Sequence, residues 1–528
     1  MDLGMQMVKA IFTVIRYGIK LLIPLAKLLL RFLIFTGGWI TVLLLFGLYN
    51  LLNKMNPSSI WYKFFNTGGW IITFLPMVYI TVQNMVRLVT KDNTFHLFSV
   101  FSVGKNSPVV PAADRNLLIK EPSGFIFGKQ KNSFVAKPEM MDGHILTVGG
   151  AGSGKSSCVG IPSLMSWKNS IFAIDIKGEL YEKTKNKRKS IKVFNPSDEN
   201  SCGYDPFYVL KSSDNLSADI NAIAIAIIPL PPNIKDPYWI KSAQTFLTGA
   251  LIYYYDNGCT FPEAIGLIQS YAPKTTVNAI ANDENQIAKM YMNQFVELDE
   301  KTLGTIFSEI SNKIMVFATD KTVISALNRP ENITPDMLEN GTDIYLCLEE
   351  SRLEQWSTLL TMMINQFLKY FEKRNEQNAT PILFLLDEFA RLGKLESIIN
   401  GLATLRSKKI TIAMLTQSLA QIDMIYGKDS RKVIADNCQY KAILSATDAE
   451  TQEYFSKLVG TCDKSKKSNS YNSDAFGIGK GTGTNTTTEE KRRIKPEDFA
   501  TLKDIVLLTP YGFSRVQKTP YYATKEFQ

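Results

Sequence analysis

Two long stretches near the start of the chain carry no charged residue. The first spans residues 32–53 and the second residues 64–86. At about 1.5 Å per residue, each is long enough to cross about 30 Å of hydrocarbon as a helix. Both stretches are apolar on all faces, which favours membrane helices over two buried helices of a soluble core. The pattern therefore predicts two transmembrane helices within residues 32–90, joined by a short outer loop.

Beyond residue 105 the pattern changes to short apolar runs that alternate with longer amphipathic segments. The short runs predict buried strands at 144–148, 170–175, 343–348, 382–386, 410–416 and 440–445. Helices are predicted between several of these strands, as at 355–373 and 395–406. Strands separated by helices indicate the α/β class with a mostly parallel sheet.

Residues 211–330 interrupt this alternation, because helical periodicity dominates there. Asp236-Pro237 is typical of a helix start and Asn257-Gly258 of a helix end. We predict an all-helical domain at 211–330, inserted between the two parts of the α/β domain at 91–210 and 331–528. Residues 463–489 are rich in Ser, Asn, Gly and Thr, which predicts a mobile loop.

The net charge of +9 is concentrated at the N-terminus. Residues 1–105 hold ten Lys and Arg against two acidic residues, whereas the remaining 423 residues hold 49 basic and 48 acidic ones. Five of the basic residues precede the first apolar stretch and two lie between the stretches. The positive-inside rule then places residues 1–31 in the cytoplasm, and two crossings return the rest of the chain there. The bulk charge gives no sign of DNA binding.

The cysteines and histidines do not form a recognisable framework. Six cysteines are scattered without a C-x-x-C pair, and the chain has only two histidines. This excludes a zinc motif and a disulfide scaffold, and it favours reduced thiols in the cytoplasm.

A nucleotide-binding motif follows the predicted strand at 144–148. The motif G-x-x-x-x-G-K-[ST] is matched at its fixed positions by Gly149, Gly154, Lys155 and Ser156. Backbone N–H groups of such a loop point at phosphate oxygens, the lysine contacts the outer phosphates and the hydroxyl binds Mg²⁺. We therefore predict that ATP is bound by Gly149, Gly150, Ala151, Gly152, Ser153, Gly154, Lys155, Ser156 and Ser157.

The second half of the site is predicted at the end of the apolar strand 382–386. Asp387 and Glu388 follow that strand directly. Asp387 is placed to hold Mg²⁺ together with Ser156, through the water shell of the ion. Glu388 is placed to polarise the attacking water, and an acid at this position favours hydrolysis over simple binding.

Two further residues are candidates for catalysis. Gln417 ends the next predicted strand, where its amide could contact the γ-phosphate; it could equally be a polar residue at the start of a helix. Arg406 lies at the end of the preceding helix, next to Lys408 and Lys409. It is either part of a solvated basic surface or an arginine finger that acts on a neighbouring subunit.

With these motifs assembled, the chain resembles the type IV coupling proteins of the TraG-like group, the membrane-anchored ATPases of conjugation and type IV secretion. The resemblance rests on GGAGSGKSS at 149–157, DIKGEL at 175–180, DEFARLG at 387–393, LTQSLAQIDMIYG at 415–427, SATDAETQEYFSKLVG at 445–460 and RVQKTPYY at 515–522. The chain departs from the usual pattern at Ile176, where the family has Pro, and at Gly150-Ala151, which replace Pro-Thr or Pro-Pro. Neither change removes a phosphate-binding group.

The resemblance implies a RecA-like P-loop motor domain with an all-helical domain, assembled as a homohexameric ring on the cell membrane. It implies ATP and Mg²⁺ as ligands and a relaxase-bound single strand of DNA as cargo, delivered to the channel proteins of a type IV secretion system. By motif position, it supports the roles given above to Lys155, Asp387, Glu388, Gln417 and Arg406.

Two alternatives stay open at this point. One is a DNA pump like the FtsK group, although that group usually has more membrane spans, a long linker and a winged-helix domain. The other is a membrane-anchored docking platform that recruits protein or nucleoprotein substrates and binds ATP without pumping.

Overall fold

The computed structural model describes residues 111–528 except 232–233, 378 and 474–478. The predicted membrane helices at 32–53 and 64–86 lie outside the described residues, as does the basic segment 1–31. Within the described part of the chain, no helix is both long enough and apolar enough to cross a membrane.

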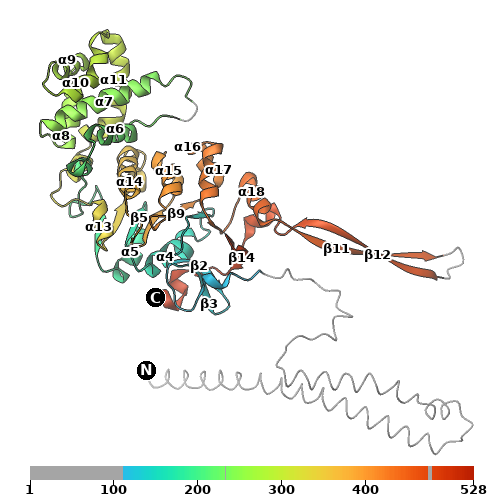
Figure 1. Cartoon of the computed structure of the whole chain (residues 1–528). Helices are drawn as coiled ribbons and strands as arrows, with labels where there is room; N and C mark the ends of the chain where they lie inside the picture. Colours follow the sequence, from blue (N-terminus) through green and yellow to red (C-terminus); the bar gives the residue numbers. More distant parts are fainter. Residues whose placement is uncertain (1–110, 232–233, 378, 474–478) are drawn as a thin grey trace, which may run out of the picture. The chain divides into compact units, whose positions relative to one another are not determined.

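A nine-stranded sheet forms the centre of the α/β domain (Figure 1). Seven of its strands are parallel neighbours, as the alternation of strands and helices predicts. In spatial order they are β10 (Tyr440–Ile443), β4 (Ile145–Val148), β9 (Ile410–Thr416), β8 (Ile382–Leu386), β5 (Ile171–Asp175), β7 (Asp343–Cys347) and β6 (Ile191–Phe194). Next to β10, the strands β13 (Ile505–Thr509) and β14 (Gly512–Val516) extend the sheet in antiparallel pairing.

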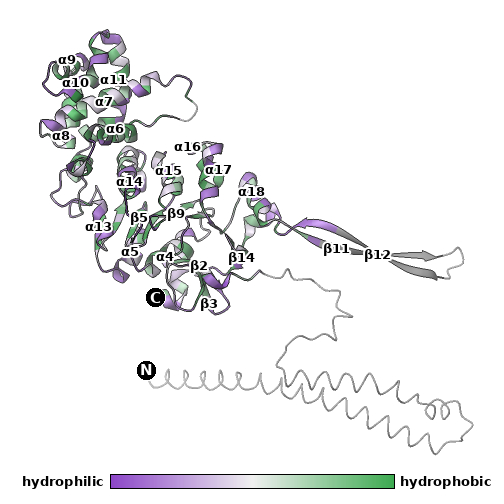
Figure 2. Ribbon diagram, viewed as in Figure 1, coloured by the Kyte–Doolittle hydropathy of each residue, from purple (hydrophilic) through white to green (hydrophobic). Residues whose placement is uncertain are grey.

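Alternating side chains of each strand pack into two separate hydrophobic layers. In β5, Phe172 and Ile174 belong to one layer, whereas Ile171 and Ala173 belong to the other. Because both faces are covered, most of the parallel strands are largely apolar, as the colour of β5 and β9 in Figure 2 shows. This apolarity makes six of the seven parallel strands predictable from the sequence, whereas β6, which contains Lys192, was not predicted.

The two layers are covered by different elements. On one face the sheet packs against α14 (Ser357–Glu372), α15 (Glu396–Thr404), α16 (Leu419–Tyr426) and α17 (Lys428–Asn437). The opposite face packs against α4 (Ile161–Ser166), α5 (Glu179–Thr184) and a small antiparallel sheet. The strands of that sheet are β1 (Leu118–Ile119), β3 (Ser133–Lys137) and β2 (Phe125–Gln130), in that order.

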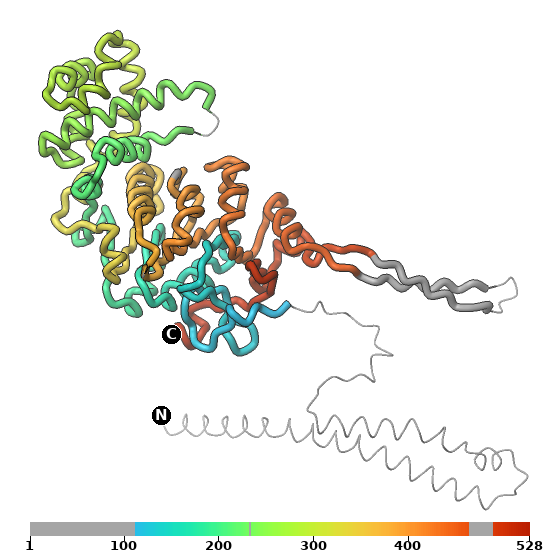
Figure 3. Tube along the Cα trace, in the orientation of Figure 1, coloured from blue at the N-terminus to red at the C-terminus, as the bar shows by residue number. Residues whose placement is uncertain are grey.

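The helical domain is inserted between β6 and β7. Its helices are α6 (Leu216–Ile227), α7 (Tyr238–Asp256), α8 (Phe261–Ser270), α9 (Pro273–Ala281), α10 (Gln286–Val296), α11 (Glu300–Thr319) and α12 (Lys321–Leu327), and their path can be followed in Figure 3. The predicted helix start and helix end are confirmed at α7, because Pro237 immediately precedes this helix and Asn257-Gly258, with a φ of 79° at Gly258, follows it. The helical domain packs against the α/β domain through α6, which contacts α14.

The sequence predicts a mobile loop at 463–489, and this prediction is wrong because the segment is regular secondary structure. The segment forms a long two-stranded antiparallel hairpin of β11 (Thr461–Ser473) and β12 (Gly479–Arg492). Composition alone suggested a loop because Ser, Asn and Gly disfavour strands in general. Thr484 and the threonines at 486–488, however, are β-branched and suit extended backbone, and the segment pairs in antiparallel register with β11.

One lysine of the small sheet is fully buried. The ammonium of Lys137 donates a hydrogen bond of 2.9 Å to the Thr411 hydroxyl, and it lies 5.8 Å from the centre of the Trp167 ring. Burial lowers the pKa of Lys137 to about 7, although the carboxylates of Asp142 and Glu139 oppose this shift. Below this pKa the protein holds a buried cation, which costs folding free energy.

We expect Lys137→Met to change the pH dependence of folding. The folded-state pKa of about 7 lies below the unfolded-state value of 10.5, so the unfolded chain binds more protons between these pH values. Wild-type stability should therefore rise with pH across this window, by an amount on the order of a few kcal/mol, whereas the variant should lack this rise. Urea unfolding at a series of pH values measures it. Exposed Lys120→Met is the control and should behave as wild type.

Candidate nucleotide site

The phosphate-binding loop lies at the C-terminal edge of the parallel strands. It begins directly after β4, where the Gly149 N–H donates a 3.0 Å hydrogen bond to the Thr416 carbonyl at the end of β9. Gly152 and Gly154 have φ angles of 72° and 99°, in the left-handed region that glycine tolerates. A Cβ atom at Gly154 would also lie 2.8 Å from the Cys158 sulfur. The loop then enters the short helical turn η3 (Lys155–Gly160), which continues into α4.

Lys155 is buried at the centre of this loop. Its ammonium donates a 2.7 Å hydrogen bond to the Gly149 carbonyl, and it lies 3.8 Å from a carboxylate oxygen of Glu388. Burial lowers the pKa of Lys155, while the charges of Glu388 and Asp387 act in the opposite direction. The structure thus brings together the three predicted charged residues, which come from the ends of two different strands.

Ser156 and Asp387 also lie next to each other, as predicted for magnesium ligands. The Ser156 hydroxyl donates a 3.4 Å hydrogen bond to Asp387 Oδ2. Burial, and then the charge of Glu388, raises the pKa of Asp387 to about 6 even though Lys155 opposes the shift. Two adjacent buried carboxylates beside a single lysine leave an excess of negative charge that a divalent cation would neutralise.

The donor set fits Mg²⁺ bound together with a nucleotide. Mg²⁺ usually takes one or two carboxylate oxygens from the protein and completes its shell with phosphate and water. Across residues 111–528, as far as they are described, no cluster of three or more His, Cys, Asp or Glu could hold a metal alone. The buried Ser153 hydroxyl has no hydrogen-bond partner within the described residues. A polar atom of this kind in the loop is suited to a phosphate oxygen.

Glu388 is held in a strained backbone conformation between two other site residues. Its φ and ψ angles are 50° and 45°, in the left-handed region that a non-glycine residue adopts at a cost of about 1–3 kcal/mol. One carboxylate oxygen faces Lys155 and the other accepts a 3.2 Å hydrogen bond from the Gln417 amide. Gln417 follows β9 directly, so the sequence placed it correctly at this edge. The Glu388 carboxylate is thus held between the Lys155 ammonium and the Gln417 amide.

Residues from the C-terminal part of the chain also contact the phosphate-binding loop, and the sequence did not predict these contacts. The Ser445 hydroxyl accepts a 3.0 Å hydrogen bond from the Gly150 N–H, and the Lys518 ammonium donates to the Ser153 carbonyl at 3.0 Å. These residues border a cavity of about 640 Å³, lined by Gly150, Ala151, Gly152, Ser153, Gln417, Ser418, Gln421, Leu444, Ser445, Thr447, Asp448, Ala500, Leu502 and Lys518. Ser445 could have been found as the polar residue that ends the predicted strand at 440–445; the observed strand β10 ends at Ile443. Lys518 carries no local signal, apart from its place in the block RVQKTPYY.

The structure does not bring Arg406 to the nucleotide site of its own subunit. Arg406 is exposed in the segment between α15 and β9, which leads into the N-terminal edge of the sheet. The nucleotide loop lies at the opposite edge. The neighbouring Lys408 and Lys409 form ion pairs with Glu376 and Asp142, at 3.3 and 3.0 Å. Arg406 therefore acts either on another subunit or as part of the surface.

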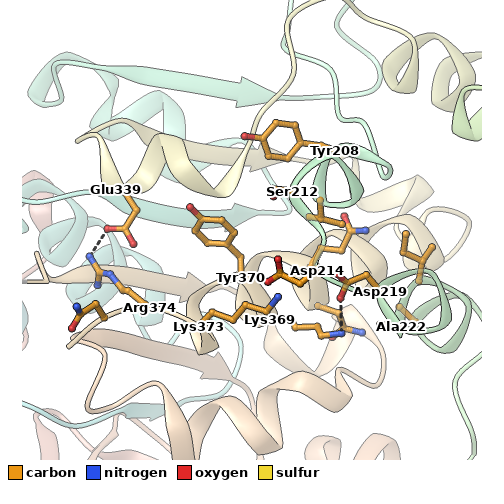
Figure 4. A pocket seen from close by; sticks show the side chains of 16 residues that line it. Tyr208, Ser212, Asp214, Asp219, Ala222, Glu339, Lys369, Tyr370, Lys373 and Arg374 are labelled. Carbon is orange, nitrogen blue, oxygen red and sulfur yellow. Dashed lines mark hydrogen bonds and ion pairs between the residues drawn. The ribbon is translucent and has the colours of Figure 1, made fainter. Parts of the chain in front are cut away.

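A second cavity, of about 470 Å³, lies between α6 and α14 (Figure 4). Its charges largely neutralise each other, since Lys369 pairs with Asp219 at 3.4 Å and Arg374 with Glu339 at 2.7 Å. The cavity has neither a glycine loop nor a residue of the predicted site. The cavity lies where the helical domain meets the α/β domain, and it is not the nucleotide site.

The sequence from residue 110 to residue 528 matches the model of the family described as Type IV secretory system Conjugative DNA transfer. The chain belongs to this family. The resemblance to type IV coupling proteins inferred from the motifs is thereby confirmed.

Similarity to curated proteins supports the same grouping. The chain is 24% identical to Protein VirD4 of Agrobacterium fabrum over 398 residues, which cover 72% of this chain and 59% of VirD4. It is 22% identical to Conjugal transfer protein TraG of Escherichia coli over 352 residues, covering 60% of this chain and 55% of TraG. The chain thus spans about three fifths of the length of the curated relatives it matches.

Solved structures share the fold. The unbound bacterial conjugative coupling protein TrwBdeltaN70 matches with a TM-score of 0.60 at 18% identity, covering 73% of this chain and 86% of that chain. TrwB in complex with the non-hydrolysable ATP analogue ADPNP matches with a TM-score of 0.60 at 16% identity, covering 78% and 95%. The match shows that this chain shares the fold of that coupling protein, an α/β domain with an inserted helical domain.

We expect Glu388→Gln to bind ATP with near wild-type affinity and to hydrolyse it about 10²–10⁴ times more slowly. The substitution keeps the shape of the side chain and its contact distance to Gln417, but removes the basic oxygen. Equilibrium binding of a labelled ATP and steady-state phosphate release measure the two effects. The exposed Glu284→Gln in the helical domain is the control and should retain both ATP binding and turnover. A parallel fall in affinity and turnover would show that Glu388 is structural.

Proposed function

We propose that this protein is a membrane-anchored ATPase that couples a relaxase-bound DNA substrate to a type IV secretion channel and drives its transfer. The observation that carries this proposal is the meeting of Lys155, Asp387, Glu388 and Gln417, from three strand ends, around the glycine loop. Membership of the conjugative DNA transfer family supports the cargo and the partners. The TrwB complexes with an ATP analogue and with ADP and Mg²⁺ support the ligands.

The chemistry follows from the arrangement of the residues. Lys155 offsets the negative charge of the outer phosphates, and the loop N–H groups orient them. Ser156 and Asp387 hold Mg²⁺, which stabilises the charge that develops on the transferred phosphoryl group. Glu388 orients and polarises the attacking water. Gln417 fixes the Glu388 carboxylate and is placed to respond when the γ-phosphate is lost.

The proposed assembly is a homohexameric ring anchored by the membrane helices at 32–53 and 64–86. The bulk of the chain then lies in the cytoplasm, next to the inner face of the cell membrane. Hydrolysis in such a ring depends on neighbours, because the site of one subunit lacks an arginine that Arg406 of another could supply. The helical domain is free of nucleotide contacts, which leaves its surface available for cargo.

The docking platform stays the second candidate. A docking platform would need the phosphate-binding loop, because it binds ATP. It would not need a catalytic base that activates water. The strained Glu388, fixed between Lys155 and Gln417, favours the motor, since simple binding does not require that conformation.

DNA stimulation of hydrolysis separates the two candidates. Phosphate release by the full-length protein in detergent should rise when single-stranded DNA is added, because a motor hydrolyses ATP faster when it engages its track. The same assay on Lys155→Ala gives the background. A protein that binds ATP, hydrolyses it slowly and ignores DNA would be a platform.

A further inference from the structure

The two edges of the parallel sheet expose opposite charges. At the N-terminal edge, the connecting segments expose five basic and two acidic side chains. At the C-terminal edge, the residues directly after the strands expose five acidic and two basic ones. The N-terminal edge consists of the segments 138–144, 167–170, 185–190, 340–342, 373–381, 405–409 and 438–439. The C-terminal edge consists of the segments 149–157, 176–178, 195–203, 348–356, 387–395, 417–418 and 444–448.

The exposed groups define two patches. The basic edge consists of Lys168, Lys187, Lys189, Lys373 and Arg406, and the acidic edge of Asp198, Glu199, Glu349, Glu350 and Glu354. The exposed acids of the N-terminal edge, Asp142 and Glu376, are already paired with Lys409 and Lys408, so they do not cancel its excess positive charge. At the C-terminal edge, Glu349 and Glu350 are paired with Arg352 and Arg391, which leaves Asp198, Glu199 and Glu354 as its excess negative charge.

Both patches lie on the same half of the sheet. The basic residues precede β5, β6, β8 and β9, and the acidic residues follow β6 and β7. These five strands are consecutive parallel neighbours; the basic residues are spread over four of them, whereas the acidic residues lie at the ends of β7 and β6. Two copies stacked head to tail without a large lateral shift would therefore bring opposite charges together. Stacked head to head, they would bring like charges together.

The nucleotide site gives this stacking a consequence. It lies at the C-terminal edge of the sheet, as does the acidic edge, whereas Arg406 belongs to the basic edge. When the basic edge of a second copy approaches this end of the sheet, Arg406 of that copy comes towards the nucleotide site. Arg406 of the subunit that holds the site lies at the opposite edge of its own sheet.

We propose that the basic edge of one subunit docks on the acidic edge of a second copy of this chain, and that this complementarity sets the direction of the ring. A head-to-tail contact uses two different surfaces, and it closes into a ring when the rotation allows. Complementary charge selects this orientation because like charges placed opposite one another cost several kcal/mol. The inference rests on the proposed ring ATPase and specifies its interface.

Two charge-reversal variants test it. The first carries Lys168→Glu, Lys187→Glu and Lys189→Glu, and the second Asp198→Lys, Glu349→Lys and Glu354→Lys. All six side chains are exposed and none belongs to the nucleotide site. Each full-length variant alone presents like charges at both edges, and its assembly in detergent should weaken at least tenfold. An equimolar mixture should assemble again, because two variants that alternate around a ring match at every contact.

Mass photometry of the separate and mixed proteins gives the result. Variants that assemble alone as wild type does, or a mixture that stays dissociated while both variants bind ATP, would overturn the inference. A control with Lys301→Glu, Lys313→Glu and Lys321→Glu carries the same charge change on exposed residues of the helical domain and should assemble normally.

A second measurement does not depend on the variants. Assembly of the wild-type protein should weaken as salt is raised from about 0.05 M to 0.5 M, since exposed charge pairs are screened. Assembly that is insensitive to salt would contradict an electrostatic interface. Absence of ATP hydrolysis in an assembled wild-type ring would instead refute the proposed motor function and leave the interface standing.

Discussion

Lys155→Ala should abolish ATP hydrolysis and, with it, DNA transfer to recipient cells. Lys155 is the side-chain cation within the phosphate-binding loop, held by the Gly149 carbonyl and facing Glu388. Without it, Glu388 and Asp387 would leave a buried site with uncompensated negative charge, which repels the phosphates. Loss of a preorganised charge of this kind costs at least about 10²-fold in rate. The predicted membrane segments at 32–53 and 64–86 do not include Lys155, so the variant should still insert in the membrane.

The measurements are phosphate release by purified protein and plasmid transfer in a mating assay. Lys177→Ala is the matched control, because Lys177 is an exposed lysine at the same edge of the sheet. It should retain both activities. Normal transfer by cells that carry only Lys155→Ala would end the motor proposal, whatever the outcome for ATP binding.

The sequence predicted the central sheet well because its strands are buried on both faces. Six of the seven parallel strands were predicted from short, mainly apolar runs, and β8 and β9 have the bounds that the pattern predicts. The seventh, β6, was missed because it is only four residues long, contains Lys192 and is only partly buried. The site residues at the ends of these strands were found for the same reason. A polar residue after a buried strand of a parallel sheet is directed to the edge where ligands bind.

The parts that were missed depend on contacts between distant segments. Lys518 reaches the loop carbonyl of Ser153 across 365 positions of the sequence, and no local pattern encodes that contact. Likewise, the left-handed conformation of Glu388 follows from the turn between β8 and η7 (Phe389–Leu392), because Glu388 itself does not favour it. The hairpin at 461–492 was missed because composition describes a segment without its partner strand.

The position of Arg406 could not be predicted from its motif alone. The sequence places Arg406 one helix beyond Glu388, which suggests proximity. The structure shows why that is misleading, since a helix that follows a parallel strand returns the chain to the opposite edge of the sheet. The distance along the chain is short, but Arg406 and Glu388 lie at opposite ends of their strands. The same topology makes Arg406 available to another subunit.

We therefore expect Arg406→Ala to bind ATP normally and to lose hydrolysis by about 10³–10⁵-fold, the contribution typical of an arginine finger. Binding should survive because Arg406 lies away from the loop of its own subunit. The loss should appear only in turnover, measured as phosphate release by the assembled protein. The adjacent Lys408→Ala is the control, because Lys408 is engaged by Glu376 at 3.3 Å.

Mixing Arg406→Ala with Lys155→Ala tests whether the arginine acts between subunits. A Lys155→Ala subunit cannot hydrolyse ATP but still presents Arg406 to its neighbour. If that neighbour is an Arg406→Ala subunit, its phosphate-binding loop is intact and it receives the missing arginine from the Lys155→Ala subunit. The nucleotide sites at such contacts in a mixed ring should then hydrolyse ATP. Partial recovery of hydrolysis is the expected result. If mixed rings form and remain inactive, Arg406 belongs to the basic surface beside Lys408 and Lys409, and the charge that develops on the γ-phosphate must be stabilised by another residue.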